Sequence, residues 1–158
     1  MKNVEIIYAS TSGNTELVME FLKSKLEVEK SIAFNLYRAE LTDIEVIQKN
    51  KFFIFGTSTW EHGVLNPFFN NLYSGLLKNN MAGKFAGFVG CGSVDYESVL
   101  FCRGIDIIKE GFVSQGGIPI GMTLKVNGDP HSQLEGYITK WVENFKPLLL
   151  AEVMKAES

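Results

Sequence analysis

The sequence predicts an α/β fold in which a doubly wound parallel sheet carries helices on both faces. Apolar runs of strand length, such as residues 51–56 and 85–90, alternate with segments whose apolar residues recur every three or four positions. That recurrence is the spacing of an amphipathic helix, and near-continuous apolar runs are typical of parallel strands covered on both faces. Strand and helix alternate five times, which predicts a five-stranded parallel sheet.

The elements follow one another in a regular order. The predicted strands span residues 4–9, 31–37, 51–56, 85–90 and 118–126. The predicted helices span residues 17–26, 44–47, 66–77, 99–112 and 130–145. The second strand alternates only loosely between apolar and polar residues, so we expect it at or near an edge of the sheet.

Length and composition limit the classes of function. The chain has 158 residues, 46% hydrophobic and 21% charged, so we expect one domain over residues 1–150 and a polar tail over residues 151–158. No apolar segment approaches the roughly 18 residues of a membrane span, and the net charge of −3 comes without a basic stripe. We therefore expect no membrane and no nucleic-acid partner. The chain opens without a long apolar segment, so we expect no secretory signal and a cytoplasmic location. We also expect a monomer.

Cys91 and Cys102 are the two cysteines of the chain, too few for a disulfide framework and not in a CxxC spacing. We expect both to be reduced thiols, with Cys91 a small apolar residue at the end of a strand. Cys91 and His62 at neighbouring strand ends formally permit a cysteine hydrolase, but no acid or Asn that would orient the histidine is identifiable. We expect no catalytic residue and no metal site.

A hydroxyl-rich loop follows the first strand and leads directly into the first helix. It reads Ser10-Thr11-Ser12-Gly13-Asn14-Thr15 and contains no basic residue. Free N–H groups of a helix's first turn, together with hydroxyl donors and the positive end of the helix dipole, favour an anion. The loop suits a phosphate monoester, since it lacks the lysine of the GxxxxGK[ST] loop that binds nucleoside triphosphates.

Two further polar loops follow the third and fourth strands, over residues 57–63 and 91–97. Right-handed crossovers place the loops after strands one, three and four together at the carboxyl edge of such a sheet, where ligands bind. We therefore expect the three loops to form one site.

The residues of all three loops resemble those of the flavodoxin family. The first loop is similar to the family's phosphate loop, [ST]-x-[ST]-G-x-T, and Thr59-Trp60 with Gly63 and Leu65 is similar to its T-W-x-x-G-x-L motif. Gly92, Tyr96 and Phe101-Cys102 resemble the third flavin loop. The resemblance covers essentially the whole chain and is to the short-chain members, which implies strand order 2-1-3-4-5.

This resemblance implies a flavoprotein that binds FMN non-covalently, with Trp60 on the inner ring face and Tyr96 on the outer face. It further implies a low-potential one-electron carrier, not an enzyme, that cycles FMN between semiquinone and hydroquinone and exchanges electrons with a flavodoxin reductase and an acceptor enzyme. The cofactor-binding residues implied are Ser10, Thr11, Ser12, Gly13, Asn14, Thr15, Ser58, Thr59, Trp60, Glu61, His62, Gly63, Cys91, Gly92, Ser93, Asp95, Tyr96, Phe101 and Cys102.

The chain departs from the family pattern in its second and third loops. Ser93 stands where the family usually has Asp, and the acid is delayed to Asp95. The chain is about two residues longer than its relatives between Tyr96 and Cys102. Glu61 follows the tryptophan where many relatives have Gly, and a positive φ at this position would cost about 1–3 kcal/mol more for Glu.

Three other functions remain open from the sequence. An FMN-dependent NAD(P)H reductase would share the loops, although the chain has no GxGxxG motif for a dinucleotide. A flavodoxin-like activator of ribonucleotide reductase is a second alternative. The third is an interaction module that has kept the fold and lost FMN, which the changes at Ser93 and in the lengthened loop permit.

Overall fold

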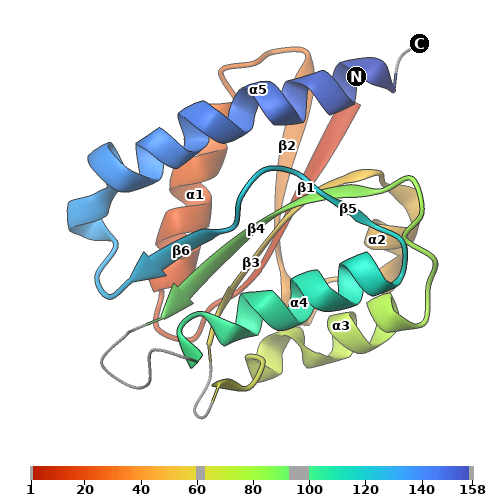
Figure 1. Ribbon diagram of the computed structural model, residues 1–158, viewed down its shortest axis with the longest axis horizontal. Helices are drawn as coiled ribbons and strands as arrows, with labels where there is room; N and C mark the ends of the chain where they lie inside the picture. The colour runs from red at the N-terminus through yellow and green to blue at the C-terminus, as the bar shows by residue number, and fades with distance from the viewer. Residues whose placement is uncertain (1, 60–62, 93–99, 157–158) are drawn as a thin grey trace.

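The computed structural model describes residues 2–59, 63–92 and 100–156, and its centre is a parallel sheet (Figure 1). The sheet has six strands in the order β2-β1-β3-β4-β5, and β6 also pairs with β4. The strands are β1 (Lys2–Ala9), β2 (Ile32–Arg38), β3 (Phe52–Ser58), β4 (Phe85–Gly92), β5 (Ile118–Pro119) and β6 (Leu124–Asn127). The doubly wound fold and its strand order are confirmed, and β2 lies at an edge as expected.

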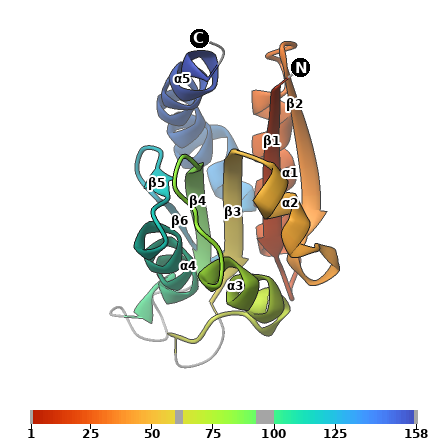
Figure 2. The ribbon, with the colours of Figure 1, turned by 90° about the vertical axis from the view of Figure 1, so that its right-hand side faces the viewer.

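Helices cover both faces of the sheet (Figure 2). They are α1 (Asn14–Leu26), α2 (Ile44–Lys49), α3 (Asn70–Leu77), α4 (Arg103–Ser114) and α5 (Thr139–Lys155). Apolar residues of α1 and α5 pack on one face, and those of α2, α3 and α4 pack on the other. None of the helices in the described part of the chain is both long enough and apolar enough to cross a membrane.

Strand β3 is buried on both faces, which accounts for the unbroken apolar run at its start, residues 52–55. Phe52 and Ile54 join the core on the α1/α5 face, while Phe53 and Phe55 join the core on the opposite face. The Phe55 ring lies 5.9 Å from that of Phe112 on α4, measured between centroids, with the rings edge to face. Because both faces of the strand are buried, alternation between polar and apolar residues is lost.

The structure differs from the sequence prediction near the far edge of the sheet. The single strand expected over residues 118–126 is divided into β5 and β6, and Gly121 between them has a φ of +63°. Both short strands pair with β4, so the predicted five strands become six without a change of order.

The helices also have bounds other than those predicted, most of all α3 and α5. The segment expected to be one helix from residue 66 begins with a 3-10 turn at Pro67–Phe69, which precedes α3. Helix α5 continues to Lys155, where the sequence prediction had a polar tail from residue 151, and Val153 is buried in the core of the α1/α5 face.

Candidate functional site

The ends of β1, β3 and β4 lie side by side at the carboxyl edge of the sheet (Figure 1). Ala9 is in register with Thr57, and Ser58 is in register with Cys91. The three polar loops therefore start next to one another, at the edge where ligands bind in such sheets.

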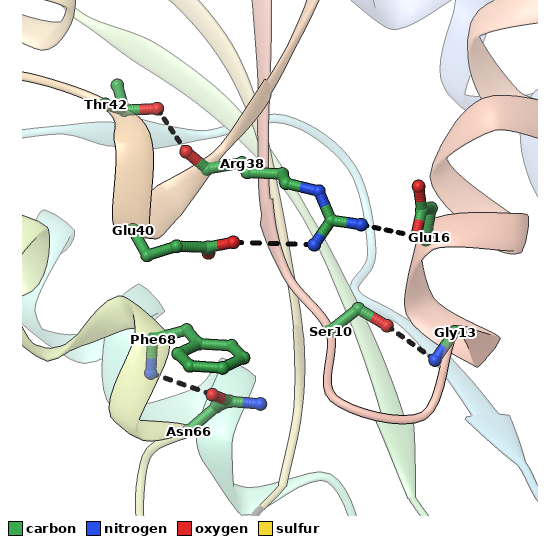
Figure 3. A network of polar contacts seen from close by, with 8 residues as sticks. All are labelled: Ser10, Gly13, Glu16, Arg38, Glu40, Thr42, Asn66 and Phe68. Atoms are coloured by element: carbon green, nitrogen blue, oxygen red, sulfur yellow. Dashed lines mark hydrogen bonds and ion pairs between the residues drawn. The ribbon is translucent and has the colours of Figure 1, made fainter.

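The first loop closes on itself and leaves the start of α1 uncapped. Ser10 Oγ accepts a hydrogen bond from the backbone N–H of Gly13 at 3.1 Å, within the turn shown in Figure 3. Gly13 is the N-cap of α1 in a left-handed conformation, φ +91°, and makes no side-chain cap. Apart from Gly13 and its two neighbours in the chain, no atom of the described residues lies within 4 Å of the position that a Gly13 Cβ would occupy. Backbone N–H groups and open space are thus both present at the positive end of the helix.

Thr15, in the first turn of α1, is a buried polar residue whose hydroxyl lacks a strong partner. Its side chain is 1% exposed, and within the described part of the chain Oγ1 has no hydrogen-bond partner at bonding geometry. The Cys91 thiol is its polar neighbour, and a thiol is a weak partner. Because an unsatisfied buried hydroxyl costs about 1–3 kcal/mol, an anion at the helix start would relieve this cost. The residues present fit a phosphate group.

The second loop is closed at its base by backbone and side-chain bonds. Thr59 forms an antiparallel bridge with Leu65, and its N–H donates to the carbonyl of Cys91 at 3.2 Å. Asn66 is fully buried and donates from Nδ2 to Ser58 Oγ at 2.7 Å. Its Oδ1 accepts from the N–H of Phe68 at 2.9 Å, the bond drawn in Figure 3. The residues on both sides of the loop are therefore held together.

The second loop is also joined to the start of α4. The N–H of Gly104 donates to Thr59 Oγ1 at 3.0 Å. Gly63 has a φ of +72°, and a Cβ there would lie 2.9 Å from a methyl carbon of Leu100. These contacts fix the residues that flank the second and third loops relative to one another.

The two cysteines lie on opposite faces of the sheet. Cys91 is buried in the core under α1 and α5, and Cys102 is buried in the core under α2, α3 and α4. Burial raises the pKa of the Cys91 thiol to about 11 and that of Cys102 to about 12. Both are neutral thiols near pH 7, which argues against the cysteine hydrolase because the thiolate is the nucleophile.

The structure describes thirteen of the residues predicted to bind the cofactor, and they lie on or beside the three strand ends. They are Ser10, Thr11, Ser12, Gly13, Asn14, Thr15, Ser58, Thr59, Gly63, Cys91, Gly92, Phe101 and Cys102. Phe101 is partly buried and packs on the α2–α4 core. The predicted ring contacts Trp60 and Tyr96, and the predicted Glu61, His62, Ser93 and Asp95, lie outside the described residues. Among those that the structure does describe, no cluster of His, Cys, Asp or Glu is arranged to hold a metal ion.

The sequence alone does not assign two residues of this region to the site. The sequence predicts Asn66 only as the first residue of a helix, although its side chain also bonds Ser58. Arg38 ends β2 beside the first loop and forms an ion pair with Glu16 of α1 at 2.8 Å. Neither link has a short-range sequence signal, since the partners are separated along the chain by 8 and 22 residues.

Comparison with known proteins agrees with this geometry. The flavodoxin family model matches residues 6–141. The flavodoxin of Maridesulfovibrio salexigens is 36% identical over 130 residues, covering 79% of this chain and 86% of that protein. The solved flavodoxin of Streptococcus pneumoniae superimposes with a TM-score of 0.84 at 26% identity, over 96% of this chain and 99% of that one. Flavodoxin 2 from Bacillus cereus gives 0.80 at 28% identity, over 97% and 99% of the two chains. The chain therefore belongs to the flavodoxin family.

Proposed function

We propose that this protein carries single electrons between redox proteins and holds FMN non-covalently at the carboxyl edge of its sheet. The observation that carries the proposal is the phosphate site: an uncapped helix start beside the buried Thr15 hydroxyl, whose polar neighbour in the described part of the chain is the weakly bonding Cys91 thiol. A phosphate monoester would satisfy both features. A solved flavodoxin of Fusobacterium nucleatum, which has the same fold with a TM-score of 0.76 at 19% identity, was determined bound to flavin mononucleotide.

The first loop and the first turn of α1 would hold the phosphate. Backbone N–H groups after Gly13 and the hydroxyl of Thr15 would donate to its oxygens, while Ser10 Oγ keeps the turn closed by accepting from the N–H of Gly13. The flat ring of FMN is assigned to the second and third loops, between Trp60 and Tyr96. Aromatic side chains on both faces of a ring exclude water and add stacking energy. When bound, FMN supplies the redox chemistry, and the protein sets how easily it gains each electron.

Charged residues near the flavin ring would set the reduction potential of bound FMN. The sequence places Glu61, Asp95 and Glu97 in the ring loops and no cation in any of the three loops. Negative groups near a ring that gains negative charge disfavour the second reduction. The carrier is therefore expected to donate electrons at low potential, as the resemblance implies.

The partners proposed are a flavodoxin reductase that supplies electrons and an enzyme that accepts them. We propose further that the protein acts as a cytoplasmic monomer. Direct reduction by a nicotinamide, which would make it an enzyme, is not favoured by any described feature of the chain. The neutral, buried thiols likewise offer no nucleophile for a hydrolase.

Stepwise reduction of the purified protein in the presence of FMN tests this proposal. The visible spectrum during dithionite addition should show bound flavin that takes up its two electrons in separate steps. NADPH should bleach the flavin only after a flavodoxin reductase is added. Rapid bleaching by NADPH alone would instead make the protein a reductase, and a colourless protein that leaves free FMN unchanged would make it an interaction module.

A further inference from the structure

An arginine on a neighbouring strand forms an ion pair with the helix turn that is proposed to bind phosphate. Arg38 ends β2, and its Nη2 donates to Glu16 Oε2 at 2.8 Å, as Figure 3 shows. Its Nη1 lies 3.4 Å from Glu40 Oε1, on the other side of the guanidinium group. Glu16 belongs to the first turn of α1, directly after Thr15.

The position of Arg38 is fixed by several contacts. Its backbone is in register with Tyr8 of β1, which lies two residues before the first loop. The Arg38 guanidinium lies over the Tyr8 ring, 5.6 Å from the centroid. Thr42 Oγ1 donates to the Arg38 carbonyl, which holds the turn after β2 (Figure 3). The side chain is thus directed at Glu16 by the strand pairing and the ring beneath it.

Glu16 poses an electrostatic problem for a phosphate site. A carboxylate in the first turn of a helix is favourable by itself, because it lies at the positive end of the dipole. A phosphate dianion bound at the same helix start would be repelled by that carboxylate. The side chain of Glu16 is 31% exposed, so water does not fully screen the repulsion.

We propose that Arg38 is a positioning residue for phosphate binding, which acts by holding the Glu16 carboxylate against β2. The inference rests on the proposed function. It makes the FMN affinity depend on a residue that lies outside the three loops. Stability alone does not explain the pair, because both side chains are about one-third exposed and such pairs contribute little to folding.

A double-mutant cycle on the apoprotein separates this role from its alternatives. The variants are Arg38→Gln, Glu16→Gln and the double variant, and the ligands are FMN, inorganic phosphate and riboflavin, which has the ring but no phosphate. Arg38→Gln is expected to weaken FMN and phosphate binding by about three- to tenfold at low salt, with a smaller loss at high salt. Glu16→Gln is expected to bind both at least as tightly as the wild type. In the Glu16→Gln background, Arg38→Gln should change affinity by less than about twofold.

Two outcomes would overturn the inference while leaving the proposed function in place. One is an equal loss from Arg38→Gln with and without Glu16, because Arg38 would then attract the phosphate itself. The other is a loss of riboflavin affinity equal to the loss of FMN affinity, which would mean a general structural role. The free energy of unfolding of each apoprotein provides the matched control. A wild type that binds neither FMN nor phosphate would overturn the proposed function and this inference together.

Discussion

The N–H of Gly104, in the first turn of α4, donates a hydrogen bond to Oγ1 of Thr59 across 3.0 Å. Thr59 is also bonded through its own N–H to the Cys91 carbonyl at the end of β4. One threonine therefore connects the loop after β3, the end of β4 and the helix that follows the third loop. The two loops assigned to the flavin ring share this anchor.

Replacing Thr59 by Val removes the hydroxyl acceptor and keeps the branched shape. Since a typical hydrogen bond contributes about 1 kcal/mol, we expect FMN affinity to fall about fivefold. Inorganic phosphate should bind unchanged, because the first loop is untouched. Titration of each ligand into apoprotein measures both effects. Thr59→Ser keeps the hydroxyl and should bind FMN like the wild type, and an equal loss in both variants would count against the hydrogen bond.

Replacing Thr15 by Val tests whether its hydroxyl donates a hydrogen bond to the phosphate of the ligand. We expect affinity for FMN and for phosphate to fall about tenfold, since a hydrogen bond to a charged group contributes about 1.5–3 kcal/mol. Stability of the apoprotein should stay equal or rise, because the buried hydroxyl that is removed has only the weak Cys91 thiol as its polar neighbour among the described residues.

Thr15→Ser serves as the control and should retain most of the phosphate affinity. Chemical unfolding of each apoprotein provides the free energy of unfolding. If Thr15→Val destabilises the apoprotein and leaves phosphate binding intact, the hydroxyl is part of the core rather than of the site.

The buried cysteines make stability depend on pH in the alkaline range. Their thiol pKa values rise from an ordinary value near 9 to about 11 for Cys91 and about 12 for Cys102, mainly through burial. The folded state then binds more protons than the unfolded state, so this stability is fully present below pH 9 and is lost as the pH rises toward 11–12. Between pH 8 and pH 10 we expect a loss on the order of 1 kcal/mol for each cysteine.

Other groups also titrate in this range, so the comparison is made with a Cys91→Ala/Cys102→Ala variant. The wild type should lose more unfolding free energy between pH 8 and pH 10 than the variant. Both thiols should also resist alkylation in the folded protein and react rapidly after unfolding. Equal losses in the two proteins would show that the thiols are not protected by the fold.

Glu5 is a buried carboxylate far along β1 from the loops. It is 2% exposed, its Oε1 accepts from Asn35 Nδ2 at 3.2 Å, and the Tyr37 hydroxyl is a further hydrogen-bonding neighbour, while Oε2 has no bond at good geometry among the residues the structure describes. Burying a polar group with an unpaired oxygen costs free energy, and Asn35 is only partly buried, so water can replace the bond that it loses. We expect Glu5→Leu to raise the free energy of unfolding by about 1–3 kcal/mol, measured by denaturant titration.

Glu5→Gln is the matched variant, since it removes the charge and retains an acceptor for Asn35. Its free energy of unfolding should lie between those of the wild type and Glu5→Leu. A Glu5→Leu protein less stable than the wild type would show that the carboxylate is better satisfied than its contacts indicate.

Much of the fold follows from short-range sequence patterns. The apolar run at Phe52–Phe55 predicts a parallel strand that is buried on both faces. The structure confirms it, since both faces of β3 are covered. The edge position of β2 follows from its looser pattern. The division of β5 from β6 was missed, because the bend at Gly121 depends on how α5 packs: Leu148 lies 3.2 Å from where a Gly121 Cβ would be.

The site was only partly predictable for a related reason. The hydroxyl-rich loop at residues 10–15 is contiguous, so its chemistry is visible in the sequence. The bonds between Thr59 and Gly104, and between Arg38 and Glu16, join residues 45 and 22 positions apart. Such pairs arise from strand register and helix packing, which composition and spacing do not specify.

Titration of FMN with the purified apoprotein tests the central claim most directly. Free FMN fluoresces, and stacking on aromatic side chains quenches that emission, so the signal reports occupation of the proposed site. We predict complete quenching at one equivalent of wild-type protein. For Thr15→Val we predict an FMN affinity about tenfold lower, because its hydrogen bond to the charged phosphate is lost. FMN fluorescence that persists in the presence of excess wild-type apoprotein would contradict the account.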